Sequence, residues 1–117
     1  MSISRKDKKL NIILNEVARD TKALYGNKLK EILLYGSYAR GEYDNESDID
    51  LMVLIDVEES ELRQYDKKLN NIINEIGYRH LKVLSILDLT CERFKNWVDV
   101  VPFYKKVRDE GIVIYEK

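Results

Sequence analysis

The stretch "GSYARGEYDNESDID", residues 36–50, is the most informative part of the sequence for the fold, because it is a polar loop between two apolar runs. "EILLY" at 31–35 precedes the loop, and "LMVLID" at 51–56 follows it. Short runs rich in Ile, Leu and Val are typical of buried strands. The loop therefore joins two predicted strands, with a Gly-Ser pair at its first end and two aspartates, one residue apart, at its second.

The two aspartates begin the second strand, "DIDLMVLID" at 48–56. Strand side chains alternate between faces, so Asp48 and Asp50 share a face, with Cα atoms roughly 6.5–7 Å apart. A bare pair of carboxylates is unfavourable because each charge repels the other. A divalent cation removes that repulsion, and Mg²⁺ or Mn²⁺ is commonly held by one or two carboxylates together with substrate phosphates. The pair is a candidate metal site.

The Gly-Ser end of the loop has the complementary chemistry. Gly36 allows the backbone to approach a ligand closely, and Ser37 offers a hydroxyl and a backbone N–H to a phosphate. Residues 38–40 can start a short helical turn whose N-terminus favours an anion. The two ends together predict a metal-triphosphate site, although the chain contains neither the G-x-x-x-x-G-K-[ST] nor the G-x-G-x-x-G pattern.

Length and composition limit the possible functions. A chain of 117 residues predicts one domain, residues 1–117, and 44% hydrophobic with 35% charged residues is typical of a soluble protein. No apolar run approaches the roughly 20 residues of a membrane span, and the N-terminus lacks the continuous apolar segment of a signal peptide, so we expect a cytoplasmic protein. A net charge of −1 gives no electrostatic surface for nucleic acid. Cys91, the single cysteine, excludes an intrachain disulfide.

Hydrophobic periodicity predicts the order helix, strand, strand, helix, strand, helix, helix and a short final strand. This order indicates an α+β (α/β-like) domain with a small mixed β-sheet of three to four strands flanked by helices. The expected elements are a helix from about Ser4 to Tyr25 ended by Gly26, strands over 29–36 and 48–56, a helix over 57–77 capped by Ser60 or an adjacent acidic residue and ended by Gly77, a strand over 80–89, helices from Thr90 to about Val98 and from Pro102 to Gly111, and a strand over 112–117.

The spacing of the loop motif resembles a known signature. Gly36-Ser37, ten intervening residues and then Asp48-Ile49-Asp50 are similar to the signature of the DNA polymerase β-like nucleotidyltransferase superfamily. The small size and the closing "VPFYKKVRDEGIVIY" at 101–115 resemble its minimal nucleotidyltransferase (MNT) branch. The resemblance covers nearly the whole chain and implies the nucleotidyltransferase fold.

The resemblance implies a role for each residue of the motif. Gly36 and Ser37 would hold the β- and γ-phosphates of ATP, and Asp48 and Asp50 would be the catalytic carboxylates that ligate Mg²⁺ or Mn²⁺. The remaining nucleotide-binding candidates are Arg40, which can reach a phosphate, and Ser47, in a supporting position. The reaction implied is an in-line attack of a hydroxyl on the α-phosphorus that expels pyrophosphate.

The third strand departs from the family pattern. Active members usually supply a third carboxylate from this strand, but the interior of "HLKVLSILDL" contains no acid. Ser85 stands where that acid is expected, on the face shared with Val83 and Leu87. Asp88, near the end of the strand and on the other face, is the remaining candidate for a third metal ligand.

Members of the MNT branch commonly act as antitoxins that adenylylate a tyrosine of a helical HEPN toxin. The resemblance therefore implies a Mg-dependent protein adenylyltransferase with a HEPN toxin as partner, in a homo- or hetero-oligomer. The missing strand acid favours an alternative, a non-catalytic antitoxin that neutralises its toxin by binding alone. A third possibility is a small-molecule nucleotidyltransferase of the aminoglycoside-modifying kind, although such enzymes usually carry a further domain.

Several other side chains have two interpretations each. His80 is expected at the surface, at the start of the third strand, because no cysteine or second histidine is present to build a zinc site with it. Tyr38 and Tyr43 are either packed residues or contacts to a base or partner. The basic residues Lys105, Lys106 and Arg108 form either a solvated helix face or a contact to the triphosphate.

Overall fold

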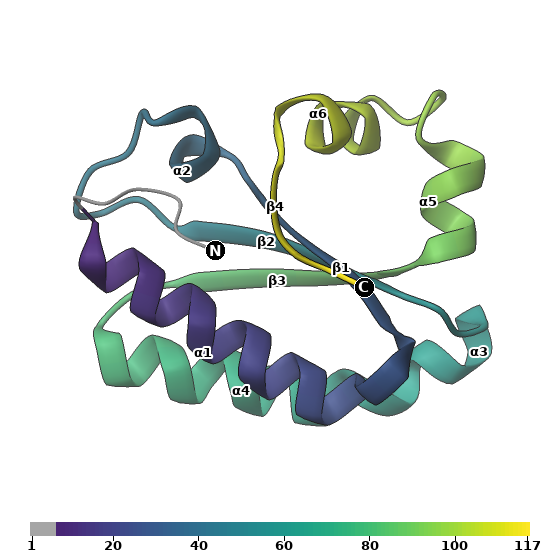
Figure 1. The fold of residues 1–117 in the computed structure, drawn as a ribbon, viewed down its shortest axis with the longest axis horizontal. Helices are drawn as coiled ribbons and strands as arrows, with labels where there is room; N and C mark the ends of the chain where they lie inside the picture. Colours follow the sequence, from purple (N-terminus) through teal and green to yellow (C-terminus); the bar gives the residue numbers. More distant parts are fainter. Residues whose placement is uncertain (1–6) are drawn as a thin grey trace.

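The computed structural model describes residues 7–117, which form a four-stranded mixed sheet with helices on both faces (Figure 1). The strand order is β3-β2-β1-β4. Strand β1 (Leu29–Tyr35) pairs antiparallel with β2 (Ile49–Ile55) and with β4 (Ile112–Glu116), and β2 pairs parallel with β3 (Leu84–Thr90). This architecture confirms the predicted α+β class, including the short final strand.

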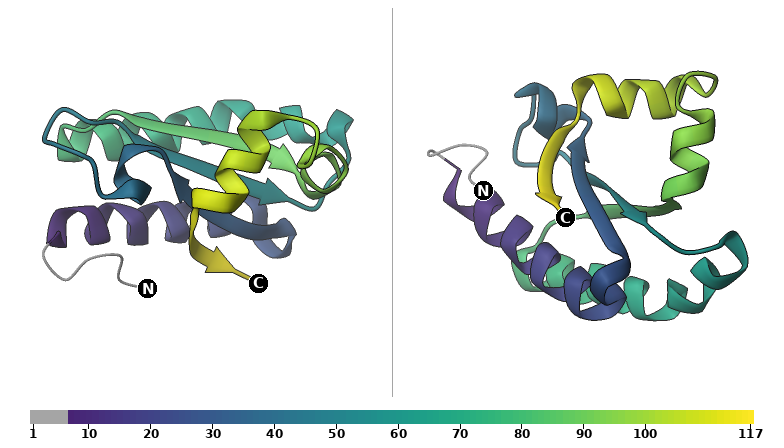
Figure 2. Two further views of the ribbon diagram at one scale, coloured as in Figure 1. Left: turned by 90° about the horizontal axis from the view of Figure 1, so that it is seen from above. Right: turned by 45° about the vertical axis from the view of Figure 1, so that its right-hand side comes forward.

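Two helices, α1 (Lys8–Tyr25) and α4 (Asp66–His80), cover one face of the sheet, and α5 (Cys91–Trp97) and α6 (Pro102–Glu110) lie on the other side (Figures 1 and 2). Alternation along the strands divides the core between these faces. The first face packs α1 and α4 on Ile32, Leu34, Leu51, Val53, Leu84 and Ile86. The second packs Val107 of α6 on Leu33, Met52, Leu54 and Leu89.

Helix α1 begins where a side chain satisfies its first backbone donors. The Asp7 carboxylate accepts a hydrogen bond of 2.8 Å from the N–H of Leu10, which is an N-cap interaction. The predicted start at Ser4 lies outside the described residues. The helix ends at Gly26, with φ of 60°, as predicted, and a 3-10 turn, η1 (Gly26–Lys28), leads into β1.

The single helix predicted over 57–77 is wrong in two respects. The segment is divided into α3 (Glu59–Leu62), a 3-10 turn η2 (Arg63–Tyr65) and α4, and the first of these begins after Glu58 without a side-chain cap from Ser60. Gly77 does not end α4, which continues to His80 and is closed by Leu81 in the left-handed conformation, with φ of 53°. A Cβ atom on Gly77 would lie 2.7 Å from the carbonyl oxygen of Lys82, so this glycine allows the chain to return closely past the helix.

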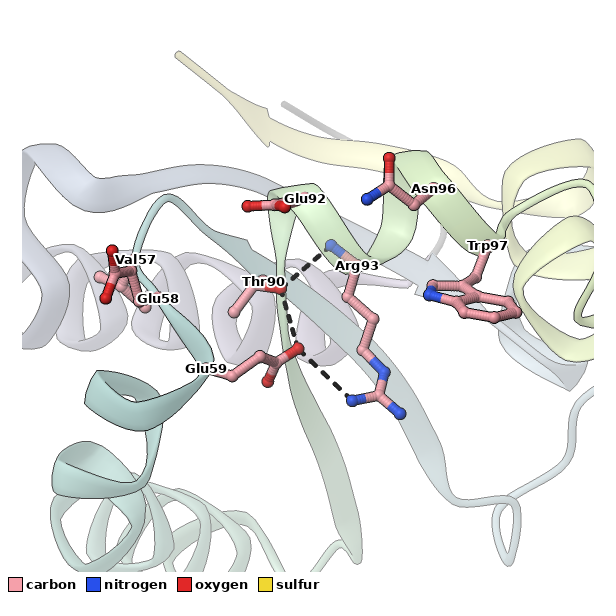
Figure 3. A pocket seen from close by; sticks show the side chains of 8 residues that line it. All are labelled: Val57, Glu58, Glu59, Thr90, Glu92, Arg93, Asn96 and Trp97. Atoms are coloured by element: carbon pink, nitrogen blue, oxygen red, sulfur yellow. Dashed lines mark hydrogen bonds and ion pairs between the residues drawn. The ribbon is translucent and has the colours of Figure 1, made fainter.

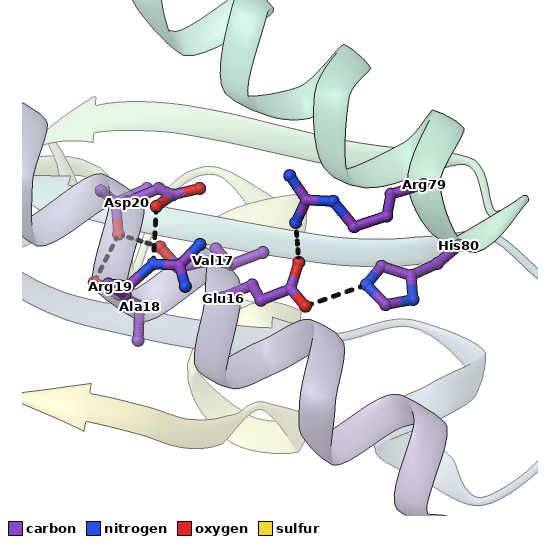
Figure 4. A network of polar contacts seen from close by, with 8 residues as sticks. Glu16, Val17, Ala18, Arg19, Asp20, Arg79 and His80 are labelled. Carbon is purple, nitrogen blue, oxygen red and sulfur yellow. Dashed lines mark hydrogen bonds and ion pairs between the residues drawn. The ribbon is translucent and has the colours of Figure 1, made fainter.

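His80 is consequently not at the start of a strand. It is the last residue of α4, and its Nε2 lies 3.0 Å from Oε2 of Glu16 in α1. Arg79 forms an ion pair with the same carboxylate (Figure 4). Both side chains of the His80–Glu16 pair are only 17% exposed, so the pair joins the two helices rather than standing free at the surface.

The C-terminal third follows the prediction closely. Thr90 caps α5 by accepting a hydrogen bond of 3.1 Å from the N–H of Arg93, and Pro102 occupies the first turn of α6, where its missing N–H costs no helix bond. None of the helices within residues 7–117 combines the length and the apolar character needed to cross a membrane.

Candidate active site

The antiparallel pairing of β1 and β2 brings the two ends of the 36–50 loop together. Tyr35 and Asp50 are register partners, so the residue after Tyr35 lies beside the aspartate. A Cβ atom built on Gly36 would lie only 2.5 Å from Oδ2 of Asp50, and the φ of Gly36 is 75°. Glycine is required here both for its backbone conformation and for the space that it leaves at the carboxylate.

The Gly-Ser end opens a short helix, α2 (Ser37–Arg40), as the sequence predicts. The backbone N–H groups of Ala39 and Arg40 both bond to the carbonyl of Gly36, at 3.1 and 3.2 Å. Gly36 and Ser37 therefore begin a helical turn, and a contact from the Ser37 hydroxyl to a phosphate stays a prediction. The turn closes at Gly41, whose φ is 74°.

The two aspartates differ in their surroundings. Asp48 is exposed, whereas Asp50 is half-buried at the start of β2. Burial raises the pKa of the Asp50 carboxyl, the charge of Asp48 raises it further, and the Arg40 guanidinium acts in the opposite direction. The structure therefore brings Gly36, Arg40, Asp48 and Asp50 into one electrostatic neighbourhood, in which negative charge on Asp50 is unfavourable without a further cation.

Arg40 stands at the edge of this neighbourhood with two weak partners. Its Nε lies 3.4 Å from Glu42, and its Nη1 lies 3.7 Å from Glu110 of α6. The guanidinium is exposed, and surface ion pairs of this kind contribute little, so a phosphate can replace either carboxylate.

Ser47 has a structural place in the loop. Its hydroxyl accepts a hydrogen bond of 3.0 Å from the N–H of Asp44 and lies 3.3 Å from the Asp44 carboxylate. The N–H of Ser47 bonds to the Asp44 carbonyl at 3.2 Å, which closes a turn immediately before Asp48. This turn sets the direction in which the chain enters β2; a contact from Ser47 to nucleotide stays a prediction.

A second set of contacts, which the sequence does not indicate, holds the 36–50 loop against the rest of the domain. Tyr38 is buried and stacks on Tyr43 with ring centroids 4.1 Å apart, and the Tyr43 hydroxyl donates to the Asp7 carboxylate at 2.8 Å. Lys82 donates to the Tyr38 hydroxyl at 3.0 Å and to the carbonyl of Asn45 at 2.9 Å. These tyrosines are therefore packed residues that hold the loop. No local pattern around Lys82 predicts its role, because its partners are 37 and 44 residues away.

The third strand brings Ser85, and not Asp88, to the aspartates. Ser85 is the register partner of Asp50 in the parallel pair and is exposed. Asp88 has the opposite orientation, toward α1, where the Tyr25 hydroxyl donates to its carboxylate at 3.4 Å. Because opposite strand faces separate Asp88 from Asp48 and Asp50, we remove it from the candidate metal site. Within residues 7–117, no three Asp, Glu, His or Cys side chains form a metal-binding group.

A hollow of about 380 Å³ lies at the other end of the sheet, between the start of α3 and α5 (Figure 3). Thr90 and Arg93 both donate to the Glu59 carboxylate there, at 3.1 and 3.4 Å, and Trp97 forms one wall. It lies at the last residue of β3, whereas the aspartates lie at the start of β2. It is thus separate from the candidate active site.

The chain is similar to known nucleotidyltransferases. Residues 14–115 match the family described as nucleotidyltransferase domain. A provisionally named protein adenylyltransferase of Methanocaldococcus jannaschii is 30% identical over 105 residues, which cover 87% of this chain and 94% of that protein. A second protein of the same provisional name and organism is 44% identical over 43 residues, which cover 37% of this chain and 43% of that protein.

Solved structures show the same fold at low sequence identity. A chain of a toxin–antitoxin crystal structure with AMP-PNP superimposes with a TM-score of 0.59 at 17% identity, covering 89% of this chain and 73% of that chain. A chain from the complex of tri-AMPylated Shewanella oneidensis HEPN toxin with MNT antitoxin gives a TM-score of 0.55 at 16% identity, covering 92% and 72%. With the match over residues 14–115, these findings show that the chain belongs to the nucleotidyltransferase domain family.

Proposed function

We propose that this protein is an antitoxin that transfers AMP from ATP to a hydroxyl, a tyrosine hydroxyl, of a HEPN toxin and so neutralises it. The observation that carries the proposal is the juxtaposition of Gly36 with Asp50 at the start of β2, with Asp48 and Arg40 beside them. Two relatives named for protein adenylyl transfer, and the fold shared with a chain of a HEPN–MNT complex, support the choice of acceptor.

The donor atoms of the site suit a magnesium ion. Asp48 and Asp50 would hold Mg²⁺ or Mn²⁺, because hard carboxylate oxygens and phosphate oxygens are the ligands that these ions prefer. Burial and the charge of Asp48 raise the pKa of the Asp50 carboxyl, so a cation bound at the pair would stabilise its charged form. When bound, the ion supplies positive charge that offsets the charge of the reacting phosphates.

The chain positions the phosphates and leaves the acceptor side open. Gly36 and Ser37 would hold the β- and γ-phosphates, and Arg40 would exchange a carboxylate partner for a phosphate oxygen. The acceptor oxygen forms a bond to the α-phosphorus while the bond from that phosphorus to the bridging oxygen of pyrophosphate breaks. A tyrosine hydroxyl, with a pKa near 10, gives its proton to water more readily than a sugar hydroxyl does. Such an acceptor lessens the need for a third carboxylate at Ser85.

The test is AMP transfer to a HEPN toxin, measured by intact mass after incubation with ATP and Mg²⁺. We expect one or more AMP additions with the wild-type protein and a loss of at least about 100-fold with Asp48→Asn or Asp50→Asn. Both variants should fold, because the first side chain is exposed and charge at the second is unfavourable. Asp88→Asn is the matched control and should keep the transfer activity, since Asp88 lies on the other face of the sheet.

A non-catalytic antitoxin is the second candidate, and Ser85 in register with Asp50 favours it, because residues 7–117 contain no metal-binding group of three carboxylates. The same variants separate the two functions. If Asp48→Asn and Asp50→Asn neutralise the toxin in cells as well as the wild-type protein does, binding alone is sufficient and the enzyme proposal fails.

A further inference from the structure

A hollow of about 200 Å³ opens beside Gly36, between α2 and α6, which lie on the same side of the sheet (Figures 1 and 2). Its inner wall is aromatic: the rings of Tyr35 and Phe103 meet edge to face with centroids 5.5 Å apart. Gly36 belongs both to this hollow and to the carboxylate site, because its Cα faces Asp50. The hollow therefore adjoins the candidate active site.

The charged groups of the hollow are two cations and one anion, namely Arg40, Lys106 and Glu110. Arg40 is shared between Glu42 and Glu110. For Lys106, in the middle of α6, residues 7–117 show no ion pair or hydrogen bond from the ammonium group. Lys106 is thus a cation without an ion-pair partner among the described residues, beside an aromatic wall, and an apolar wall strengthens the attraction of such a charge for an anion.

We propose that this hollow receives the terminal phosphates of the nucleoside triphosphate and that Lys106 contacts them directly. The inference rests on the proposed function, in which Gly36 and Ser37 hold the β- and γ-phosphates and Asp48 and Asp50 hold the metal ion. Gly36 also lines this hollow, so phosphates held at Gly36 would extend into it. A nucleobase would fit the aromatic wall, but it carries no charge that would call for two cations.

The negative charge of Glu110 would disfavour the same phosphates. It is the last residue of α6, where a negative charge is unfavourable next to the helix C-terminus, and its only ion pair within residues 7–117 is the long one to Arg40. Terminal phosphates in the hollow would compete with Glu110 for Arg40. The Glu110 carboxylate therefore weakens nucleotide binding, and Lys106 strengthens it.

The test compares the affinities of the wild-type protein and single variants for ATP and for AMP, in Mg²⁺, by equilibrium titration. Lys106→Gln should weaken ATP binding by roughly tenfold or more, the effect of losing one charge-assisted hydrogen bond, and should leave AMP binding unchanged. Lys105→Gln is the matched control, since Lys105 is exposed on the same helix and does not line the hollow; it should change neither affinity. Glu110→Gln should tighten ATP binding and not AMP binding.

Inorganic tripolyphosphate provides a second measurement that involves no nucleoside. It should compete with ATP on the wild-type protein and compete more weakly on Lys106→Gln. Equal weakening of ATP and AMP by Lys106→Gln would place the nucleoside in the hollow and overturn the inference. ATP binding that is unchanged in a folded Lys106→Gln protein would overturn it as well, and would leave the proposed function intact. A wild-type protein that binds no ATP would overturn both.

Discussion

Gly36 and Asp50 approach so closely that the site has no room for a Cβ atom: one on Gly36 would lie 2.5 Å from Oδ2 of Asp50. Gly41 has a similar φ, 74° against 75°, but its ψ of 17° is that of the left-handed helical region, whereas the ψ of Gly36 is −155°. A Cβ atom on Gly41 would meet nothing within 4 Å among residues 7–117. The two glycines that flank α2 therefore both need a positive φ, and only Gly36 has a steric constraint as well.

This difference makes Gly36→Ala and Gly41→Ala a matched pair. Gly41→Ala should lose roughly 1–2 kcal/mol of unfolding free energy, because L-residues are strained in the left-handed region, and Gly36→Ala should lose more, because its φ and ψ are close to a region that only glycine adopts readily. Only Gly36→Ala should also weaken binding of Mg-ATP, because its methyl group displaces the Asp50 carboxylate. Chemical denaturation measures the first effect and nucleotide titration the second. An equal loss of affinity in the two variants would show that the close approach to Asp50 has no part in binding.

Ser85 offers a way to add the carboxylate that the third strand lacks. It lies on the strand next to Asp50, in register with it, so the two Cα atoms are about 4.8 Å apart. Ser85→Asp should bind Mn²⁺ more tightly than the wild-type protein, because a third oxygen ligand joins the pair. In the absence of metal it should be less stable, because a third negative charge repels the other two.

Leu87→Asp is the control for this prediction. Leu87 lies on the same face of β3, two residues further along, and is 37% exposed. The added carboxylate is then opposite Met52 instead of Asp50, and Mn²⁺ affinity should not rise. Titration of Mn²⁺ by electron paramagnetic resonance distinguishes the variants. A similar gain of Mn²⁺ affinity in Ser85→Asp and Leu87→Asp would mean that an added negative charge at either position, and not a carboxylate in register with Asp50, increases metal binding.

Much of this arrangement could be predicted from the sequence, because local patterns encode it. The apolar runs on each side of the loop predicted β1 and β2, and strand alternation correctly separated the face of Ser85 from that of Asp88. The meeting of Gly36 with Asp50 followed from joining the two strands by one loop. Each of these inferences depends on residues that are near one another in the chain.

The errors and omissions have a common physical origin in contacts between distant segments. Gly77 has the sequence signal of a helix end, yet it lies inside α4 because the returning chain at Lys82 passes close to it. Lys82 holds the loop, and Lys106 reaches the hollow at Gly36, only because the fold brings separate elements together. No periodicity or local motif reports such approaches.

The actual end of α4 gives a stability prediction. Leu81 closes the helix with φ of 53°, and its side chain is 85% exposed, so it is strained without being packed. Leu81→Gly should therefore stabilise the protein by roughly 0.5–1 kcal/mol, which is the strain relieved less the larger entropy of glycine in the unfolded chain. Leu81→Ala removes the same exposed side chain but keeps the strain, and should change stability by less than about 0.5 kcal/mol. Equal gains from both would trace the effect to the leucine side chain and not to the backbone.

The contact between α1 and α4 should make stability depend on pH through Glu16. Burial alone would raise the pKa of the Glu16 carboxyl, but the hydrogen bond and charge of His80, together with Arg79, lower it below its usual value. A carboxyl with a lowered pKa in the folded state contributes stability that is present above the unfolded-state pKa, near 4.5, and is lost as pH falls through the folded-state value.

Glu16→Gln should therefore destabilise the protein at pH 7 by roughly 0.5–1.5 kcal/mol, the range for the loss of a typical hydrogen bond, and the difference from the wild-type protein should shrink as the pH is lowered below about 4. Asp20→Asn is the control on the same helix, because within residues 7–117 Asp20 forms an ion pair, at 3.0 Å, only with its exposed neighbour Arg19. Its effect should be small at all pH values. Denaturation at a series of pH values measures both variants. If the loss of unfolding free energy in Glu16→Gln were unchanged at pH 3, the charge of the carboxylate would not be what holds α1 to α4. The shape and packing of the side chain would then explain the contact.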